Sequence, residues 1–259
     1  MKKSALSRKN CGDYPLIFNY ISSLFTSLET ELKYETPFQL LVAVMMSAQT
    51  TDKQVNKITD HFFTILKHPQ DAVNLGQEKI QEEIKSVNYC RAKAKHIYQT
   101  SLLLLEWSAP FMKSLSRKNY GRGKGGFEKS KIQKKLTLKE LVLFKQYGYY
   151  IPETESELTK LPGVGEKTAK VIQYVLFKKP VIAVDTHVHR VTNRLGIVAT
   201  KTPEETSKQI QTKIPKEYRN IAHHAFILFG RYYCKAIKPK CETCQLQQIC
   251  KFYNEKLKQ

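Results

Sequence analysis

Apolar residues recur at the three- and four-residue spacing of amphipathic helices along most of the chain, and no stretch shows convincing period-two alternation. Residues 40–46, Leu-Leu-Val-Ala-Val-Met-Met, are apolar on every side, which predicts a buried helix. An amphipathic helix is expected to begin after Asp13, and its apolar positions are Leu16, Ile17, Tyr20, Ile21, Leu24, Phe25 and Leu28. The pattern as a whole predicts an all-α fold.

Capping signals mark several helix starts. The stretches at 36–39, 137–140 and 202–205 each have threonine followed three residues later by Gln or Glu, the pattern of a capping box. Thr51 and Asp52 are predicted to cap another helix, which Pro69 is expected to end. Further helices are predicted near residues 78–86, 91–107, 153–160, 166–178, 186–195, 203–212 and 218–231.

Residues 108–146 interrupt this pattern. They contain eleven lysines and arginines against Glu128 and Glu140, and four of the eleven glycines in the chain lie between 121 and 126. The first part is predicted to be a flexible loop, and 138–146 a helix. Two interpretations follow: a solvated loop without a role, or an auxiliary arm that contacts phosphates.

The chain of 259 residues is long enough for one large or two modest domains, and its formal net charge of +20 favours a polyanionic partner. No apolar run approaches the ~20 residues that span a bilayer, so no membrane association is expected. Residues 1–12 hold no acidic side chain and are predicted to be a mobile basic tail. They lack the apolar core of a secretory signal, but an organellar presequence stays open as an alternative.

Four of the six cysteines fall within 17 residues, as Cys234, Cys241, Cys244 and Cys250 in the spacing C-x6-C-x2-C-x5-C. Without a secretory signal, this clustering indicates metal ligation in a reducing compartment and not disulfides. Four thiolates suit a 4Fe–4S cluster or one tetrahedral zinc. Zinc ribbons usually carry two Cys-x2-Cys pairs, and this loop has one, so the spacing favours the cluster. Cys11 and Cys90 receive no role.

A Pro-Gly-x-Gly turn between two predicted helices, Leu161–Gly165, has the form of a helix-hairpin-helix. Glycines in such a turn permit positive φ and close approach, so that backbone N–H groups face a phosphate at a helix N-terminus. This arrangement binds DNA through its backbone without reading sequence.

Two ionisable residues follow the turn, 18 positions apart. Lys167 lies in the first helical turn, where the helix dipole disfavours an ammonium and favours a nucleophilic amine. Asp185 precedes another helix and reads as its N-cap, which suits a carboxylate that stabilises a developing cation better than a strong base. The alternative for Lys167 is an ordinary exposed lysine, and for Asp185 a cap with no further role.

Four motifs in this order closely resemble endonuclease III of the helix-hairpin-helix DNA glycosylase superfamily: SAQTTD at 47–52, LPGVGEKTA at 161–169, VDTHVHR at 184–190, and the cysteine loop. The resemblance covers about residues 14–107 and 147–253. It implies two helical domains with a DNA groove between them. A six-helix domain at 36–180 contains the hairpin and the basic insert at about 108–146, and a second domain at 14–35 plus 181–259 holds the cluster loop, after a flexible leader at 1–13.

The resemblance also implies roles for individual residues. Lys167 would attack C1′ of the damaged nucleotide, and Asp185 would assist across the groove. Leu161, Gly163 and Gly165 would offer N–H groups to phosphate. Of the remaining positions, Gln49 would fill the hole left by the flipped base, Tyr89 replaces the Leu or Phe wedge usual in relatives, and His187 would lie beside the base pocket or pack as an ordinary histidine.

The function implied by the resemblance is base excision repair. The enzyme would be a bifunctional glycosylase that removes oxidised pyrimidines and an AP lyase that cuts 3′ to the lesion through a lysine Schiff base. The alternative is a non-catalytic or differently specific helix-hairpin-helix DNA-binding protein with a structural metal site. The expected cofactor is a 4Fe–4S cluster, and the expected partner is damaged or abasic duplex DNA. A monomer in the bacterial cytoplasm, associated with the nucleoid, is anticipated.

Overall fold

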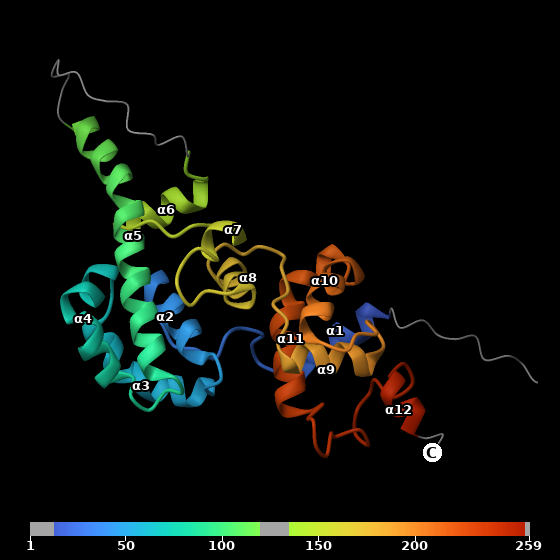
Figure 1. Cartoon of the computed structure of the whole chain (residues 1–259). Helices are drawn as coiled ribbons and strands as arrows, with labels where there is room; N and C mark the ends of the chain where they lie inside the picture. The colour runs from blue at the N-terminus through green and yellow to red at the C-terminus, as the bar shows by residue number, and fades with distance from the viewer. Residues whose placement is uncertain (1–12, 120–134, 257–259) are drawn as a thin grey trace, which may run out of the picture. The chain divides into compact units, whose positions relative to one another are not determined.

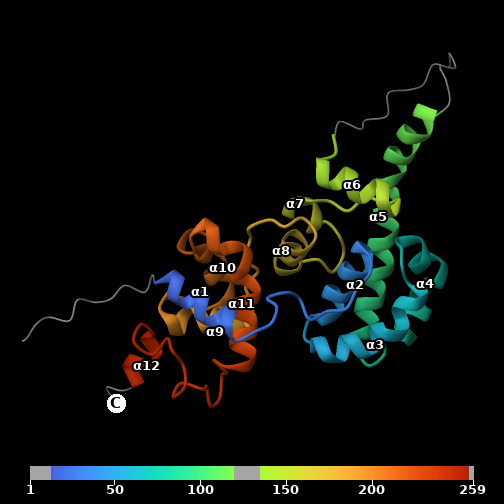
Figure 2. The ribbon, with the colours of Figure 1, turned by 180° about the vertical axis from the view of Figure 1, so that it is seen from behind.

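A computed structural model of the protein describes residues 13–119 and 135–256, so the predicted leader at 1–12 and residues 120–134 of the basic insert lie outside the described residues. Helices are the sole regular elements of the described ranges, which contain no strand (Figures 1 and 2). Contacts divide the chain into a hairpin unit, Glu31–Phe177, and a cysteine unit made of the segment up to Thr30 together with Lys178–Gln259. The sequence places these boundaries at 35/36 and 180/181, a few residues later.

The hairpin unit is built around α2 (Pro37–Ser47), which contacts α3 (Asp52–Ile65), α5 (Cys90–Asn119) and α8 (Glu166–Val175). Every residue from Pro37 to Met46 is buried, which confirms the prediction from the all-apolar run. The polar exception, Gln39, is satisfied: its Nε2 donates to the carbonyls of Phe63 and Leu66 at 3.0 and 2.9 Å. Thr36 and Gln39 also form the predicted capping box.

Pro69 begins a helix instead of ending one, which corrects the sequence prediction. α3 ends at Ile65, and Pro69 takes the first position of α4 (Pro69–Glu83). The Asp71 carboxylate accepts the N–H groups of Lys67 and His68 at 2.9 and 2.8 Å, so a proline without an N–H fits the helix start. Gly76, with φ of 76°, then bends α4 in the middle.

α5 extends twelve residues beyond its predicted end at Trp107, through Pro110 to Asn119, so the first part of the predicted loop is helical. An internal proline removes a helix bond, and packing must compensate. Here the Phe111 ring lies 5.8 Å from Phe144 of α6 (Leu138–Tyr147) and 5.4 Å from Tyr150. Figure 1 shows α5 as the long helix that passes α6 and α4.

The cysteine unit packs α1 (Tyr14–Ser23) and α9 (Thr186–Leu195) against α11 (Arg219–Tyr232). Phe18 of α1 stacks on Tyr218 at 4.9 Å and meets Phe226 at 5.4 Å. α1 ends earlier than its apolar pattern, and Leu24, Phe25 and Leu28 contact the same core from beyond the helix. The remaining elements are α10 (Pro203–Lys213), η1 (Lys216–Tyr218) and the unpredicted six-residue α12 (Lys251–Lys256).

None of the helices in the described ranges has the length and apolar character needed to cross a membrane.

Candidate functional site

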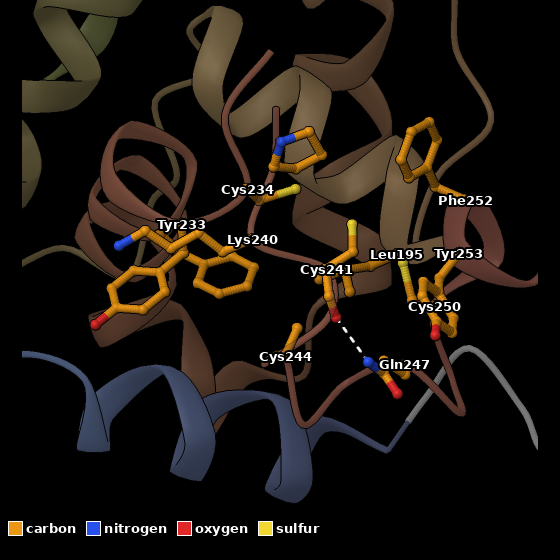
Figure 3. Close-up of a pocket in the computed structure, with 12 residues that line it drawn as sticks. Leu195, Tyr233, Cys234, Lys240, Cys241, Cys244, Gln247, Cys250, Phe252 and Tyr253 are labelled. Atoms are coloured by element: carbon orange, nitrogen blue, oxygen red, sulfur yellow. Dashed lines mark hydrogen bonds between the residues drawn. The ribbon is translucent and has the colours of Figure 1, made fainter. Parts of the chain in front are cut away.

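The four clustered cysteines surround one cavity in the cysteine unit (Figure 3). Cys234 follows α11, Cys241 and Cys244 lie in the loop, and Cys250 directly precedes α12. The aromatic rings of Phe229, Tyr233, Phe252 and Tyr253 contribute to the wall of this cavity. The four cysteines that are close in sequence therefore line the same cavity, together with apolar side chains.

The cysteine loop is tied to the helices by charged donors. Arg190 of α9 donates from Nε to the Cys234 carbonyl at 3.1 Å. Arg194, one helical turn later, donates to the carbonyls of Lys235 and Ala236 at 2.6 and 3.1 Å, and to Cys234 Sγ at 3.6 Å. From within the loop, Gln247 donates to the Cys241 carbonyl at 2.7 Å, the dashed bond in Figure 3.

The spread of the thiols fits a multi-iron cluster better than a single ion. Within residues 13–119 and 135–256, no three His, Cys, Asp or Glu side chains lie close enough together to bind one metal ion. A tetrahedral zinc needs four sulfurs at about 2.3 Å. The four thiols instead line one shared cavity without such a close grouping, an arrangement that suits a larger object.

Burial makes three of these thiols, Cys241, Cys244 and Cys250, weaker acids. It raises the pKa of Cys250 to about 11 and is the largest cause that raises the pKa of Cys244 and Cys241. Because thiolates are the ligands of iron and zinc, occupation of the cavity by a metal group must release protons. Loading is therefore expected to be favoured by higher pH.

In the hairpin unit, the turn Leu161–Gly165 joins α7 (Glu155–Leu158) to α8. Leu161 is buried and its N–H donates to the Leu158 carbonyl at 3.0 Å, and a phosphate contact of this N–H stays a prediction. Gly163 has φ of 78°, and a Cβ there would lie 2.8 Å from His96 Nδ1 and 2.9 Å from His96 Cβ. Positive φ and close approach thus both apply to Gly163.

Gly165 has a different reason to be glycine. It is the N-cap of α8 with φ of −89°, and a Cβ added to it would meet nothing within 4 Å. Within the described ranges, no acceptor bonds the N–H of Gly163 or Gly165. These exposed amides stand at the N-terminus of α8, where the helix dipole favours an anion.

The two glycines are expected to separate stability from DNA binding. Gly163→Ala should lower the free energy of unfolding by about 2 kcal/mol or more, through left-handed strain and the clash with His96. Gly165→Ala should change it by less than about 1 kcal/mol, yet weaken binding to abasic-analogue duplex about tenfold because the methyl group occupies the phosphate approach. Thermal unfolding and fluorescence anisotropy measure both, and equal effects at the two positions would contradict this assignment.

Lys167 is an exposed residue in the first turn of α8, two positions after Gly165. The opposite face of the helix, with Ala169 and Ile172, is fully buried in the core of the hairpin unit. Packing of α8 therefore fixes the direction in which Lys167 extends, on the same helix end as the hairpin amides.

Asp185 caps α9 in the cysteine unit, as its position in the sequence predicts. Its Oδ1 accepts the N–H groups of His187 and Val188, both at 2.9 Å. The preceding buried connector is held by Gln211, which donates to the Ile182 carbonyl at 3.1 Å, and by a His223 contact to the Ala183 carbonyl at 3.0 Å. The carboxylate thus has a fixed position on a rigid element.

His187 lies half-buried where α9 and α11 approach each other. A Cβ at Gly230 of α11 would come within 3.0 Å of His187 Cβ, and Arg190 Nη2 lies 3.3 Å from His187 Nδ1. Burial, together with Arg190 and Arg231, lowers the pKa of His187. A neutral imidazole that packs between helices fits this geometry, and a role beside a base pocket stays a prediction.

Gln49 and Tyr89 are the two non-glycine residues with positive φ in the described hairpin unit, at 57° and 60°. Both are exposed, Tyr89 with 68% of its surface accessible. Their loops are joined, because Asn88 Nδ2 donates to the Gln49 carbonyl at 2.5 Å. Such a conformation costs about 1–2 kcal/mol per residue and often marks a functional position. The structure thus presents both predicted DNA-contacting side chains from neighbouring strained turns.

One face of α5 supports both the turn that carries Gln49 and the hairpin turn Leu161–Gly165. Sequence reasoning missed this face. Lys93 donates to the carbonyls of Met46 and Ala48 at 2.7 and 2.5 Å, His96 lies beneath Gly163, and Thr100 donates to the Pro162 carbonyl at 2.9 Å. The spacing i, i+3, i+7 puts these three side chains on one helix face. Three polar residues at this spacing, on an otherwise apolar helix face, are the signal in the sequence that could have indicated the supporting role of α5.

Comparisons with known proteins identify the family of this chain and its relatives. Residues 42–216 match the family model of HhH-GPD superfamily base excision DNA repair proteins, and residues 234–250 match the iron–sulfur binding domain of endonuclease III. Endonuclease III of Bacillus subtilis is 38% identical over 232 residues, which cover 89% of this chain and 88% of that protein. Endonuclease III of Escherichia coli is 34% identical over 228 residues, with coverage of 88% and 89%.

The fold is also similar to a solved structure of a trapped covalent intermediate between endonuclease III and DNA. The TM-score is 0.74 and the identity 32%, over 96% of this chain and 99% of that chain.

Proposed function

The chain belongs to the endonuclease III family of helix-hairpin-helix base excision repair proteins, and on this premise we propose that it releases oxidised pyrimidines from duplex DNA and cleaves the resulting abasic strand. It is a base excision repair enzyme, a DNA glycosylase that binds DNA and carries a 4Fe–4S cluster. The lyase step, the oxidised-pyrimidine substrate and the action as a monomer at the bacterial nucleoid are the proposed refinements.

The observation that carries the proposal is the placement of Lys167. A primary amine stands in the first turn of α8, directly after two exposed amides, at Gly163 and Gly165, that suit a phosphate. A DNA backbone held by these amides brings a deoxyribose within reach of the amine. This arrangement supports a nucleophilic role for Lys167 over that of an ordinary surface lysine.

The chemistry proposed for Lys167 has two stages. Its neutral amine attacks C1′ of a nucleotide flipped out of the stack, the N–C1′ bond forms, and the glycosidic bond breaks with release of the protonated base. The sugar ring then opens: the C1′–O4′ bond breaks, a proton from the nitrogen passes to O4′, and the imine that forms acidifies C2′. Loss of a C2′ proton then breaks the C3′–O bond, which leaves a 5′-phosphate on the downstream strand and an unsaturated aldehyde on the upstream one.

Asp185 is proposed to stabilise the positive charge that develops at the sugar. Asp185→Asn keeps an oxygen for the helix cap, so the free energy of unfolding should change by only about 0.5 kcal/mol, whereas base release should slow about 10²-fold. Asp185→Ala should add a loss of about 1 kcal/mol from the missing cap. Single-turnover kinetics and thermal unfolding separate the two effects, and a wild-type rate in Asp185→Asn would remove this residue from the mechanism.

The other site residues hold the DNA and the cofactor. Gln49 is proposed to fill the hole left by the flipped base, and Tyr89 to wedge into the opposite strand, in agreement with their exposure and strained backbone. The proposed cluster ligands are Cys234, Cys241, Cys244 and Cys250. Their thiolates would hold the four irons, and the cluster would supply structural order to the loop.

The test is incubation of the purified protein with a duplex that carries one thymine glycol. Release of the base, with 3′ ends characteristic of β-elimination, is the expected outcome. Base release that leaves an intact abasic strand would restrict the function to a monofunctional glycosylase. Activity on undamaged mismatches alone would overturn the proposed substrate class.

A further inference from the structure

The turn that carries Gln49 is held from within by a buried lysine. Lys93 of α5 keeps only 7% of its surface accessible. Its ammonium donates to the carbonyls of Met46 and Ala48 at 2.7 and 2.5 Å and reaches Thr50 Oγ1 at 3.4 Å. One side chain thus binds three positions of a single turn.

The same turn is held from outside by Asn88, whose Nδ2 donates to the Gln49 carbonyl at 2.5 Å and whose backbone N–H donates to Thr50 Oγ1 at 3.3 Å. Together, Lys93 and Asn88 engage the carbonyls of residues 46, 48 and 49. A non-glycine residue at positive φ persists only where its surroundings over-determine it. These bonds supply that determination for Gln49, whose side chain remains exposed.

A lysine is a costly choice for this position. Burial lowers the pKa of Lys93, which shows that the site penalises the ammonium. An apolar side chain of similar length would pack against the same core without that penalty. Unlike an apolar side chain, the ammonium can donate to several carbonyls at once, so its contribution is specific to the turn.

We infer that Lys93 is a positioning residue for catalysis, which acts through Gln49 by holding it in the conformation that fills the DNA hole. This inference rests on the proposed role of Gln49. Its consequence is that loss of Lys93 and loss of Gln49 produce the same defect, and that the two losses do not add. A residue with a merely structural role would instead lower stability and add to any other defect.

The test uses a duplex with a stable tetrahydrofuran abasic analogue placed opposite 2-aminopurine. A side chain that enters the hole alters the stacking of 2-aminopurine and therefore its fluorescence. The wild-type protein is expected to change the fluorescence on binding, whereas Gln49→Ala and Lys93→Met should each lose most of that change and bind about tenfold more weakly. The double variant should bind no more weakly than the weaker single variant.

Two further variants serve as controls. Lys95→Met removes the same charge from an exposed position of α5 and is expected to keep the fluorescence change. Asn88→Ala releases the turn from the exposed side without touching the core, so it decides the matter even if Lys93→Met does not fold, and it should lose part of the signal. Three results would overturn the inference: retention of the full signal in folded Lys93→Met, retention of the full signal in Asn88→Ala where Lys93→Met does not fold, or losses that add to those of Gln49→Ala.

The design also separates this inference from the proposed function, because an abasic analogue requires no base release. Coupled losses on the analogue, without release of any oxidised pyrimidine by the wild-type protein, would leave Lys93 in its role and refute the proposed substrate. Release of oxidised pyrimidines with no coupling between Lys93 and Gln49 would support the proposed substrate and refute the positioning role of Lys93.

Discussion

Replacement of Lys167 by alanine is expected to lower the rates of base release and strand cleavage by roughly 10³-fold or more, because the reaction then lacks its nucleophile. The folded structure should persist, since Lys167 is exposed and the helix is held by its opposite face. Single-turnover kinetics on a thymine glycol duplex measure the effect, with thermal unfolding as the check on stability.

Two matched variants separate the amine from its charge and its location. Lys167→Arg keeps a cation at the helix start but no nucleophile, so binding should survive and cleavage should not. Lys160→Ala removes an exposed lysine just before the hairpin and should leave the rate of the chemical step intact. If Lys167→Arg retained strand cleavage, Lys167 would serve as a phosphate contact and not as the nucleophile.

Substitution of Cys244 by serine is expected to abolish the visible absorption of the iron–sulfur cluster and to lower the unfolding temperature of the cysteine unit by on the order of 10 °C. The reason is that the loop between α11 and α12 has little regular structure of its own, so the bound group holds it together. Iron content, the absorption spectrum and thermal unfolding measure the loss.

Cys90→Ser is the control for this experiment, since Cys90 begins α5 in the hairpin unit and is not among the residues that line the cavity. It should keep both the iron and the stability of the cysteine unit. A colourless wild-type protein that contains one zinc would contradict the cluster geometry argued from the spread of the thiols.

The sequence predicted correctly those helix ends that are set by residues next to them in the chain, such as caps. The bounds of α9, 186–195, were predicted correctly because Asp185 caps one end and Gly196 adopts a left-handed φ of 78° at the other. The end of α5 was not, since Pro110 reads as a helix breaker and the contacts of Phe111 with Phe144 and Tyr150 that stabilise the extension are distant in sequence.

The candidate site divides in the same way. Residue types at fixed spacing revealed the hairpin glycines, Lys167, Asp185 and the cysteines, because each follows from a local motif. The support from Lys93 and the close approach of His96 to Gly163 connect positions more than forty residues apart, so the polar spacing on α5 does not by itself reveal which turns these side chains contact. The left-handed backbone of Gln49 is likewise invisible in a stretch without glycine.

The central claim is that Lys167 forms a covalent bond to the sugar of the damaged nucleotide. Its most direct test is borohydride reduction of the wild-type protein with a thymine glycol duplex, followed by peptide mapping of the adduct. One trapped complex is expected, with the DNA attached to the peptide that contains Lys167. An adduct on any other residue, or release of the base with no trapped complex, would contradict it.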